Sequence, residues 1–249
     1  MRILVMNVNT TASMTATMRE GAQAVARPGT EIVATEPTWG PASVEGYYES
    51  YVSAAAILDR LHQLLDPERP GGPLQFDAMV WAGFGEHGKE AAMELLDVPV
   101  LNITDAAAHL ACLIGRKYGV ITTVERAIGQ IEENLLVAGL LEKCASIRAT
   151  GMNVLDLEKD EDATVARFVD VARQSLADGA EVLLLGCGGM SGLQERITAE
   201  LGVPVVDGVA AAVKLAEALV DLRLSTSKVC SYAAPLPKAR PGWPVTARG

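Results

Sequence analysis

The sequence predicts an α/β fold of two pseudo-symmetric lobes, each a mostly parallel sheet flanked by helices, with an active site in the cleft between them. First, short apolar runs rich in β-branched residues alternate with helical patterns along most of the 249 residues. Second, these runs are apolar on both faces, as in parallel strands buried between helices. Third, each half of the chain has a strand that leads into a polar turn and, later, a strand that ends in a glycine turn.

The elements follow from these patterns in chain order. The runs expected to be strands are "RILVM" (2–6), "EIVAT" (31–35), "AMVWA" (78–82), "VPVLNI" (98–103), "YGVIT" (118–122), "VLLLG" (182–186) and "VPVVDG" (203–208). Helical patterns are expected at 12–26, 49–65, 88–96, 124–138, 161–178, 191–201 and 208–222. Residues 66–73 are read as a loop and 235–249 as an extended or disordered tail, because proline and glycine interrupt both.

The strand ends define where a ligand should bind. In open α/β sheets, ligands bind at the carboxyl ends of the strands. The polar turns at 7–11 and 122–124 and the glycine turns at 83–88 and 186–190 follow such ends. The candidate site is therefore built from these four turns.

Composition narrows the class of protein. The chain is 49% hydrophobic and 21% charged with a net charge of −10, so we expect no nucleic-acid partner. No run approaches the length of a membrane span, and the apolar N-terminal stretch is too short for a signal peptide, which predicts a cytoplasmic protein without membrane association. The four cysteines are far apart and form no CxxC or CxxH pair, which argues against a metal site and against disulfides.

The turn "GFGEHG" (83–88) matches two nucleotide-binding patterns. It fits G-x-G-x-x-G between a strand and a helix, and Asp105 follows Gly83 by 22 residues, near the end of the next strand, where a ribose-binding acid is expected. Against this, Glu86 would place a carboxylate beside a pyrophosphate. A P-loop is disfavoured because Glu90 stands where that motif needs Ser or Thr.

Cys187 is the cysteine whose surroundings suggest chemistry. It lies at a strand end between Gly186 and Gly188, where the backbone permits close approach of a ligand and a helix is expected to follow, a setting that activates a thiol. The alternative is a small core residue in a tight turn. Cys112 and Cys144 fall in or after helical patterns and are expected to be inert, and Cys230 has no chemical context.

Polar side chains accompany the remaining strand ends. Asn7, Asn9, Thr10 and Thr11 follow the first strand, and Thr122 and Thr123 stand at the matching place in the second half. Such groups can hold a carboxylate or an imide, or cap the next helix, and the two roles are compatible. His87 is the histidine of the candidate turns and is either an acid or base or simply exposed.

The ordered motifs resemble the hydantoin and allantoin racemases of the aspartate/glutamate racemase superfamily. The matching stretches include "RILVMNVNTTASMT", "GPASVEGYYE", "YGVITT", "LLLGCGGM", "GVPVVDGVAAAVKLAE" and "STSKVCSYAAP". The resemblance implies two lobes, with residues 1–102 plus 208–249 in the first and 103–207 in the second. It also implies a homo-oligomer that needs no cofactor.

The family's chemistry implies roles for individual residues. One cysteine removes a proton next to a carbonyl and a second delivers one to the opposite face. The resemblance carries the second thiol to Cys187 and the first to Gly83, where this chain lacks it. The residues expected to bind the substrate are Asn9, Thr10, Ser43, Phe84, Thr122, Thr123 and Gly188.

Three explanations for Gly83 stay open. The chain is an inactive or altered racemase, His87 or Glu86 replaces the missing base, or one face alone is protonated, as in arylmalonate decarboxylase, which has a glycine and one cysteine at these positions. The resemblance favours a racemase that acts on a small cyclic ureide or a related carbonyl acid. A single-cysteine decarboxylase and an inactive ligand-binding homologue are the alternatives.

Overall fold

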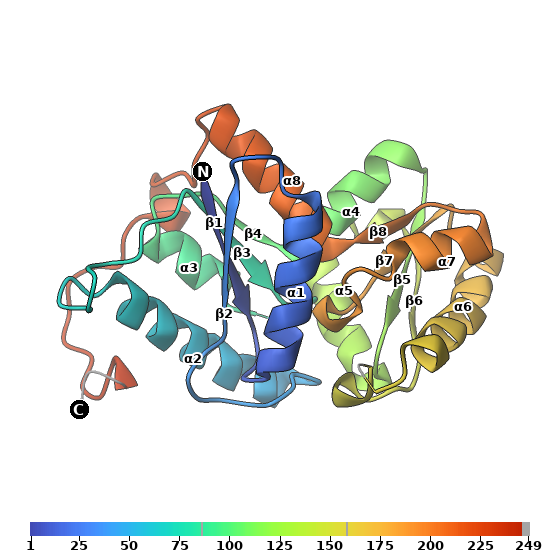
Figure 1. Ribbon diagram of the computed structural model, residues 1–249, viewed down its shortest axis with the longest axis horizontal. Coiled ribbons are helices and arrows are strands. Elements are labelled where there is room, and N and C mark those ends of the chain that lie inside the picture. The colour runs from blue at the N-terminus through green and yellow to red at the C-terminus, as the bar shows by residue number, and fades with distance from the viewer. Residues whose placement is uncertain (86, 158, 246–249) are drawn as a thin grey trace.

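Two parallel four-stranded sheets stand side by side in the computed structural model, which describes residues 1–85, 87–157 and 159–245 (Figure 1). The strand order is β2-β1-β3-β4 in the first sheet and β6-β5-β7-β8 in the second. The same order of strands therefore recurs in the two halves of the chain, and helices flank both sheets. The predicted fold class is confirmed.

The strands and helices alternate along the chain. The strands are β1 Arg2–Asn7, β2 Glu31–Thr35, β3 Ala78–Ala82, β4 Val100–Asn102, β5 Tyr118–Thr122, β6 Cys144–Ala149, β7 Val182–Leu185 and β8 Val205–Asp207. The α-helices are α1 Ala12–Val25, α2 Tyr47–Leu65, α3 Lys89–Leu95, α4 Ile103–Ile114, α5 Ile128–Val137, α6 Glu161–Ala177, α7 Gln194–Leu201 and α8 Gly208–Asp221. The short 3₁₀ turns are η1 Glu125–Ala127, η2 Leu141–Lys143, η3 Val154–Asp156, η4 Gly188–Met190 and η5 Cys230–Tyr232. Among the described residues, no helix is both long and apolar enough to cross a membrane.

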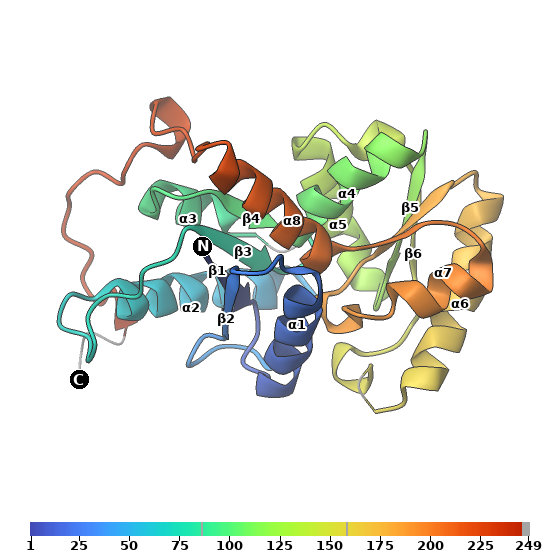
Figure 2. The same cartoon turned by 45° about the horizontal axis from the view of Figure 1, so that its top comes forward.

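A central hydrophobic cluster joins the two sheets. It includes Val5 and Val80 of the first sheet and Val120 and Leu184 of the second, all buried. The helices α1, α4 and α8 lie between the sheets in both views (Figures 1 and 2). The helices α4 and α8 pack against each other, and both contribute alanines with small side chains to this cluster, at 106–108 and 111 on α4 and at 211, 212 and 216 on α8. This cluster joins the two sheets, and each sheet has a further hydrophobic cluster on its other face.

The helix α8 follows the second sheet in the chain but packs against β3 and β4 of the first. Its Glu217 carboxylate accepts hydrogen bonds from the backbone N–H of Arg27 at 2.9 Å and the hydroxyl of Thr30 at 2.8 Å. These contacts tie α8 to the loop between α1 and β2. The lobe boundaries at 102/103 and 207/208 stay a prediction.

Three elements differ from the sequence expectation: β6, β4 and α4. The strand β6 lies at an edge of its sheet and is half-buried, and its mixed "CASIRA" pattern did not predict a strand. The expected strand 98–103 is shorter than predicted, because Asn102 accepts a hydrogen bond from the backbone N–H of Asp105 at 2.7 Å and so caps α4. The helix α4 was not among the predicted helices.

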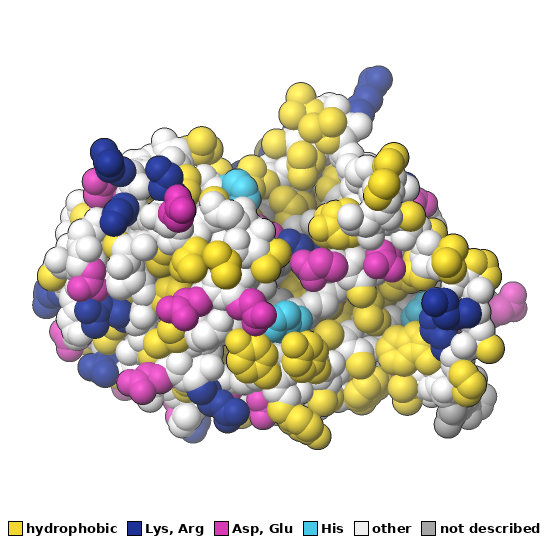
Figure 3. All heavy atoms as spheres, turned by 180° about the vertical axis from the view of Figure 1, so that it is seen from behind, with side chains coloured by type: hydrophobic (Ala, Val, Ile, Leu, Met, Phe, Trp, Pro, Cys, Tyr) yellow, Lys and Arg dark blue, Asp and Glu magenta, His cyan; other side chains and the backbone are white. Residues whose placement is uncertain are grey.

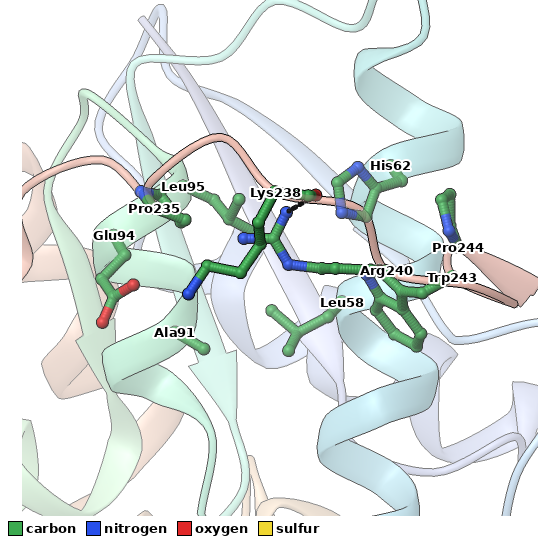
Figure 4. A pocket seen from close by; sticks show the side chains of 10 residues that line it. All are labelled: Leu58, His62, Ala91, Glu94, Leu95, Pro235, Lys238, Arg240, Trp243 and Pro244. Atoms are coloured by element: carbon green, nitrogen blue, oxygen red, sulfur yellow. Dashed lines mark hydrogen bonds between the residues drawn. The ribbon is translucent and has the colours of Figure 1, made fainter.

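The chain after α8 runs back over the first lobe. Thr226 donates to the carbonyl oxygen of Val98 at 3.1 Å, and the Lys228 ammonium donates to that of Met93 at 2.6 Å. Further on, the segment passes over α2 and α3, and Lys238, Arg240 and Trp243 line an open cavity of about 360 Å³ together with residues of these helices (Figure 4). Residues 235–245 form no helix or strand, in keeping with the expected extended tail.

Charged side chains of both signs are spread over the surface. On the face drawn in Figure 3, Lys and Arg side chains lie scattered among Asp and Glu rather than in a continuous basic band. Together with the net charge of −10, this distribution offers that face no track for a phosphate backbone.

Candidate active site

The four strand-end turns meet at one buried cavity between the two sheets. Its volume is about 30 Å³. The described residues that line it come from both lobes: Val8, Asn9, Met14, Met18, Val44, Ala82, Gly83, Phe84, Thr122, Thr123, Ala127, Val154, Gly186, Cys187 and Gly188. Seven of the ten predicted site residues are therefore in this wall: Asn9, Gly83, Phe84, Thr122, Thr123, Cys187 and Gly188.

The two glycine turns face one another directly. A Cβ atom placed on Gly188 would lie 3.2 Å from the carbonyl oxygen of Ala82, the residue before Gly83. A Cβ atom on Gly186 would lie 2.7 Å from the carbonyl oxygen of Ile121. These contacts leave no room for larger residues on either side of Cys187. The absence of side chains brings the half-buried Cys187 close to the Gly83 turn.

Hydrogen bonds hold the polar turn of the first lobe in a single conformation. The Asn7 amide donates to Asn9 Oδ1 and to Thr15 Oγ1, both at 3.0 Å, and the Thr11 N–H donates to Asn9 Oδ1 at 2.9 Å. The Asn9 amide nitrogen reaches the Met14 sulfur at 3.6 Å. Asn9 is buried at the cavity wall, where its amide group can face a ligand.

The polar turn of the second lobe is fixed to the Cys187 turn. The Thr122 hydroxyl donates to the carbonyl oxygen of Gly186 at 3.1 Å. The carbonyl oxygen of Thr123 accepts from the Gly151 N–H at 2.8 Å and from the Thr150 hydroxyl at 3.2 Å. Both threonines are buried at the cavity. Thr122 thus holds the backbone next to the thiol in addition to lining the site.

Thr10 and Ser43 lie outside the described cavity wall. The Thr10 N–H donates to the carbonyl oxygen of Pro41 at 3.0 Å. The Ser43 hydroxyl donates to Glu45 at 3.4 Å, and the same carboxylate oxygen accepts from the Val154 N–H at 3.3 Å. These bonds connect the loop before α2 to the polar turn and to the second lobe. They hold the loop that supplies Val44 to the cavity.

His87 also lies outside the cavity wall. Its ring stacks on Tyr51 with centroids 5.2 Å apart, and its Nδ1 atom is 3.3 Å from the Ser50 hydroxyl. Its Nε2 atom is 3.6 Å from a carboxylate oxygen of Glu133. The imidazole therefore belongs to a group on α2 and α5, apart from Cys187. Glu86, the other proposed substitute base, lies outside the described residues.

The nucleotide-binding patterns find no support in the local contacts. The Asp105 carboxylate, expected to bind a ribose, is in the first turn of α4 and forms an ion pair with Lys89 at 2.5 Å. Burial alone would lower the pKa of Lys89, but the nearby Asp105 carboxylate raises it above its ordinary value, so the Lys89 ammonium stays charged. The helix after the glycine turn, α3, has seven residues.

The remaining cysteines are set apart from the cavity. Burial raises the pKa of Cys144 to about 12, and burial also raises the pKa of Cys112. Both thiols are therefore protonated at neutral pH, as expected for inert cysteines. Cys230 is exposed near the C-terminal segment. Within the described residues no three His, Cys, Asp or Glu side chains are arranged to hold a metal ion.

The wall also contains eight described residues that were not among the predicted site residues: Val8, Met14, Met18, Val44, Ala82, Ala127, Val154 and Gly186. Met14 and Met18 are one helical turn apart on α1, directly after the polar turn, and both are 2% exposed. Two methionines one helical turn apart, directly after the "NVNTT" turn in sequence, are the pattern that could have predicted that both side chains line this cavity. Val44 comes from a loop and Val154 from the short turn η3, and neither segment has a periodic pattern, so only the tertiary structure brings the two residues together.

A half-buried thiol therefore lies beside amide and hydroxyl groups at the strand ends of two parallel sheets, an arrangement typical of an α/β enzyme. A family model described as Asp/Glu/Hydantoin racemase matches residues 3–216, and the chain belongs to this family of racemases.

Individual relatives agree over nearly the full chain. A hydantoin racemase of Rhizobium meliloti is 40% identical over 99% of this chain and 100% of its own. The crystal structure of an allantoin racemase from Pseudomonas fluorescens is 53% identical, with a TM-score of 0.91 over 96% of this chain and 99% of that one. Arylmalonate decarboxylase, at 18% identity and a TM-score of 0.56, covers 96% of each chain and shares the fold.

Proposed function

We propose that the protein moves a proton at the carbon next to a carbonyl of a small cyclic ureide of the allantoin or hydantoin type. Cys187 would be the acid and base. The observation that carries this proposal is that Cys187 and Gly83, the two positions of the family's thiols, line one cavity. The 53% identity to an allantoin racemase supports a ureide as the substrate.

The proposed step balances without a cofactor. The Cys187 thiolate takes the proton from the ring carbon, the C–H electron pair moves toward the carbonyl, and the oxygen of the resulting enolate carries the charge. Asn9 and Thr123 line the cavity where that charge develops, and their amide and hydroxyl groups can stabilise it. The Thr122 hydroxyl donates to the carbonyl oxygen of Gly186, so Thr122 positions the turn beside the thiol. Return of the proton from the same thiol restores the starting configuration.

Inversion needs a proton from the opposite face. Among the described residues of the cavity wall, Cys187 is the side chain that titrates, and Gly83 has no side chain. Water over Gly83 would then be the second donor, a weaker acid than a thiol. We therefore propose that proton exchange is faster than racemisation.

One experiment separates these steps. The protein is incubated with each enantiomer of allantoin and of 5-substituted hydantoins in deuterated water, and deuterium at the ring carbon is followed together with optical rotation. We expect exchange that outpaces loss of rotation. Gly83→Cys should raise the rate of inversion, because it supplies a thiol on the other face. The absence of both exchange and inversion in every substrate, before and after Gly83→Cys, would exclude the proposal.

The single thiol at the cavity favours a second candidate, a decarboxylase that forms its carbanion by loss of carbon dioxide and protonates one face. Release of carbon dioxide from an arylmalonate would support the decarboxylase. Consumption of the ureide without proton exchange would not support it. An inactive ligand-binding homologue would show neither reaction.

We further propose that the protein acts in the cytoplasm as a homo-oligomer on a small molecule and needs no metal or organic cofactor. Acid–base chemistry by a thiol at an activated carbon requires neither. Unchanged exchange after exhaustive dialysis against a chelator is the expected result.

A further inference from the structure

The cavity beside Cys187 is much smaller than a usual ligand pocket. Its volume of about 30 Å³ holds roughly one water molecule. Pockets for small molecules usually have about 300–1,000 Å³. A ring-sized substrate can therefore contact Cys187 after some side chains of the wall have moved.

Most of the described wall cannot move by side-chain rotation. The glycines and alanines have no rotamers, and the three valines are restricted at χ1 because they branch at Cβ. Hydrogen bonds hold Asn9 and Thr122, and Phe84 is packed within the central cluster. Methionine, with an unbranched side chain and three rotatable bonds, adapts its shape most readily. Met14 and Met18 are the methionines of this wall.

The two methionine methyl groups fill the space over the turn that carries the thiol. The Met18 methyl carbon would be 2.6 Å from a Cβ atom on Gly188. The Met14 methyl carbon would be 2.7 Å from a Cβ atom on Gly189, and that same position is 3.7 Å from the Cys187 sulfur. Each methyl thus occupies the place that a side chain of the turn would otherwise take.

We propose that Met14 and Met18 are a movable wall that covers Cys187, rotates away to admit a ligand, and limits the size of the substituent on the substrate ring. The identity of that substrate rests on the proposed function. The proposal about access to the Cys187 thiol does not rest on the proposed function, because it concerns the positions of the two methionines.

Access can be measured by alkylation of Cys187, followed as mass-labelled peptides, with iodoacetamide as a small reagent and a bulky N-substituted maleimide as a large one. In Met14→Ala and Met18→Ala, we expect the maleimide rate at Cys187 to rise about tenfold or more, with a smaller change for iodoacetamide. Met93→Ala, the same change on α3 outside the cavity wall, should leave both rates unaltered. The exposed Cys230 provides an internal reference in every sample.

Leucine variants cover the case in which the alanine variants fold poorly. Leucine has nearly the volume of methionine but a branched, less adaptable side chain. Met14→Leu with Met18→Leu should therefore slow alkylation of Cys187 by both reagents. Maleimide rates at Cys187 that stay equal to the unmodified protein in folded alanine and leucine variants would overturn the proposal.

Substrate preference gives a second readout. The ratio of kcat/KM for 5-benzylhydantoin to that for 5-methylhydantoin should rise in the alanine variants, by about 10-fold or more, because a larger substituent then fits. If no ureide reacts, the proposed function is wrong, and the alkylation rates still show whether Met14 and Met18 control access to Cys187. If ureides react and the ratio and the alkylation rates are unchanged, the wall proposal fails alone.

Discussion

Gly188 of the second lobe lies against the carbonyl oxygen of Ala82 of the first, close enough that a Cβ atom on Gly188 would stand 3.2 Å from that oxygen. The contact joins the turn that carries Cys187 to the turn that carries Gly83. It explains why a pair of glycine-rich turns, about 100 residues apart in the chain, builds one site. Backbone faces backbone there, so the two turns are held at a short distance without side chains between them.

Substitution of Gly188 tests this contact. In Gly188→Ala, the methyl group meets the Ala82 carbonyl and the Met18 methyl carbon, so the backbone must shift and we expect a loss of about 1–3 kcal/mol in unfolding free energy. Gly189→Ala is the matched control, because its methyl group meets the ends of the Met14 and Leu157 side chains. Urea unfolding of both variants provides the measurement, and equal losses would show that the backbone contact is unimportant.

Removal of the thiol tests its chemical role. In Cys187→Ala, we expect proton exchange at the ureide carbon to fall by about 10²–10⁴, the usual contribution of a positioned acid or base. Thermal stability should change little, because Cys187 is half-buried and lines a cavity. Cys230→Ala, at an exposed cysteine, should keep full activity. Deuterium incorporation at the ureide carbon, followed by NMR, measures exchange in both variants. Exchange at the full rate in Cys187→Ala would show that the thiol is not the acid or base.

Asp207 anchors the backbone that follows the thiol. Its buried carboxylate accepts from the Ser191 hydroxyl at 2.7 Å, the Gly192 N–H at 2.9 Å and the Val209 N–H at 2.7 Å. In Asp207→Asn, the amide nitrogen must face one of these donors, so we expect a loss of about 1–3 kcal/mol in unfolding free energy and reduced activity.

Asp178→Asn is the control for this prediction. That carboxylate pairs with Arg148 near the surface, and surface pairs contribute about 0–1 kcal/mol. Both variants are compared by urea unfolding at pH 7. A cost at Asp178 as large as that at Asp207 would contradict the anchoring role.

Glu217 makes stability depend on pH. Burial alone would raise its pKa, but hydrogen bonds from Lys214, the Arg27 N–H and Thr30 lower it below the ordinary value of 4.5. A lowered pKa stabilises the folded state above the unfolded pKa, and this stabilisation is lost as the pH falls below about 4.5.

We expect Glu217→Gln to lower the unfolding free energy at pH 7 by about 1–3 kcal/mol, since three donors lose a charged acceptor. The difference from the unmodified protein should shrink as the pH falls below 4.5. Urea unfolding from pH 7 to pH 3 measures it. A difference that stays constant across this range would show that the carboxylate charge makes no contribution.

Local pattern was sufficient for most of the fold. Strands 78–82 and 118–122 have the predicted bounds, because an apolar run buried on both faces has few other stable arrangements. The edge strand β6 escaped prediction because only part of it is buried, which leaves a mixed pattern. At Asn102 and Asp207 the strand ends earlier than its apolar run suggests, since each side chain caps the next helix.

For the site, the sequence alone determined the strand-end turns, the position of Cys187 and the absence of a thiol at Gly83, because these depend on residue type and on the order of elements. The tertiary structure decided which side chains share the cavity. His87, within the Gly83 turn in sequence, stacks on Tyr51 instead, while Met14, Met18, Val44 and Val154 line the cavity together with Cys187. The physical reason is that a turn fixes where the backbone goes, whereas the direction of each side chain depends on packing between segments far apart in the chain.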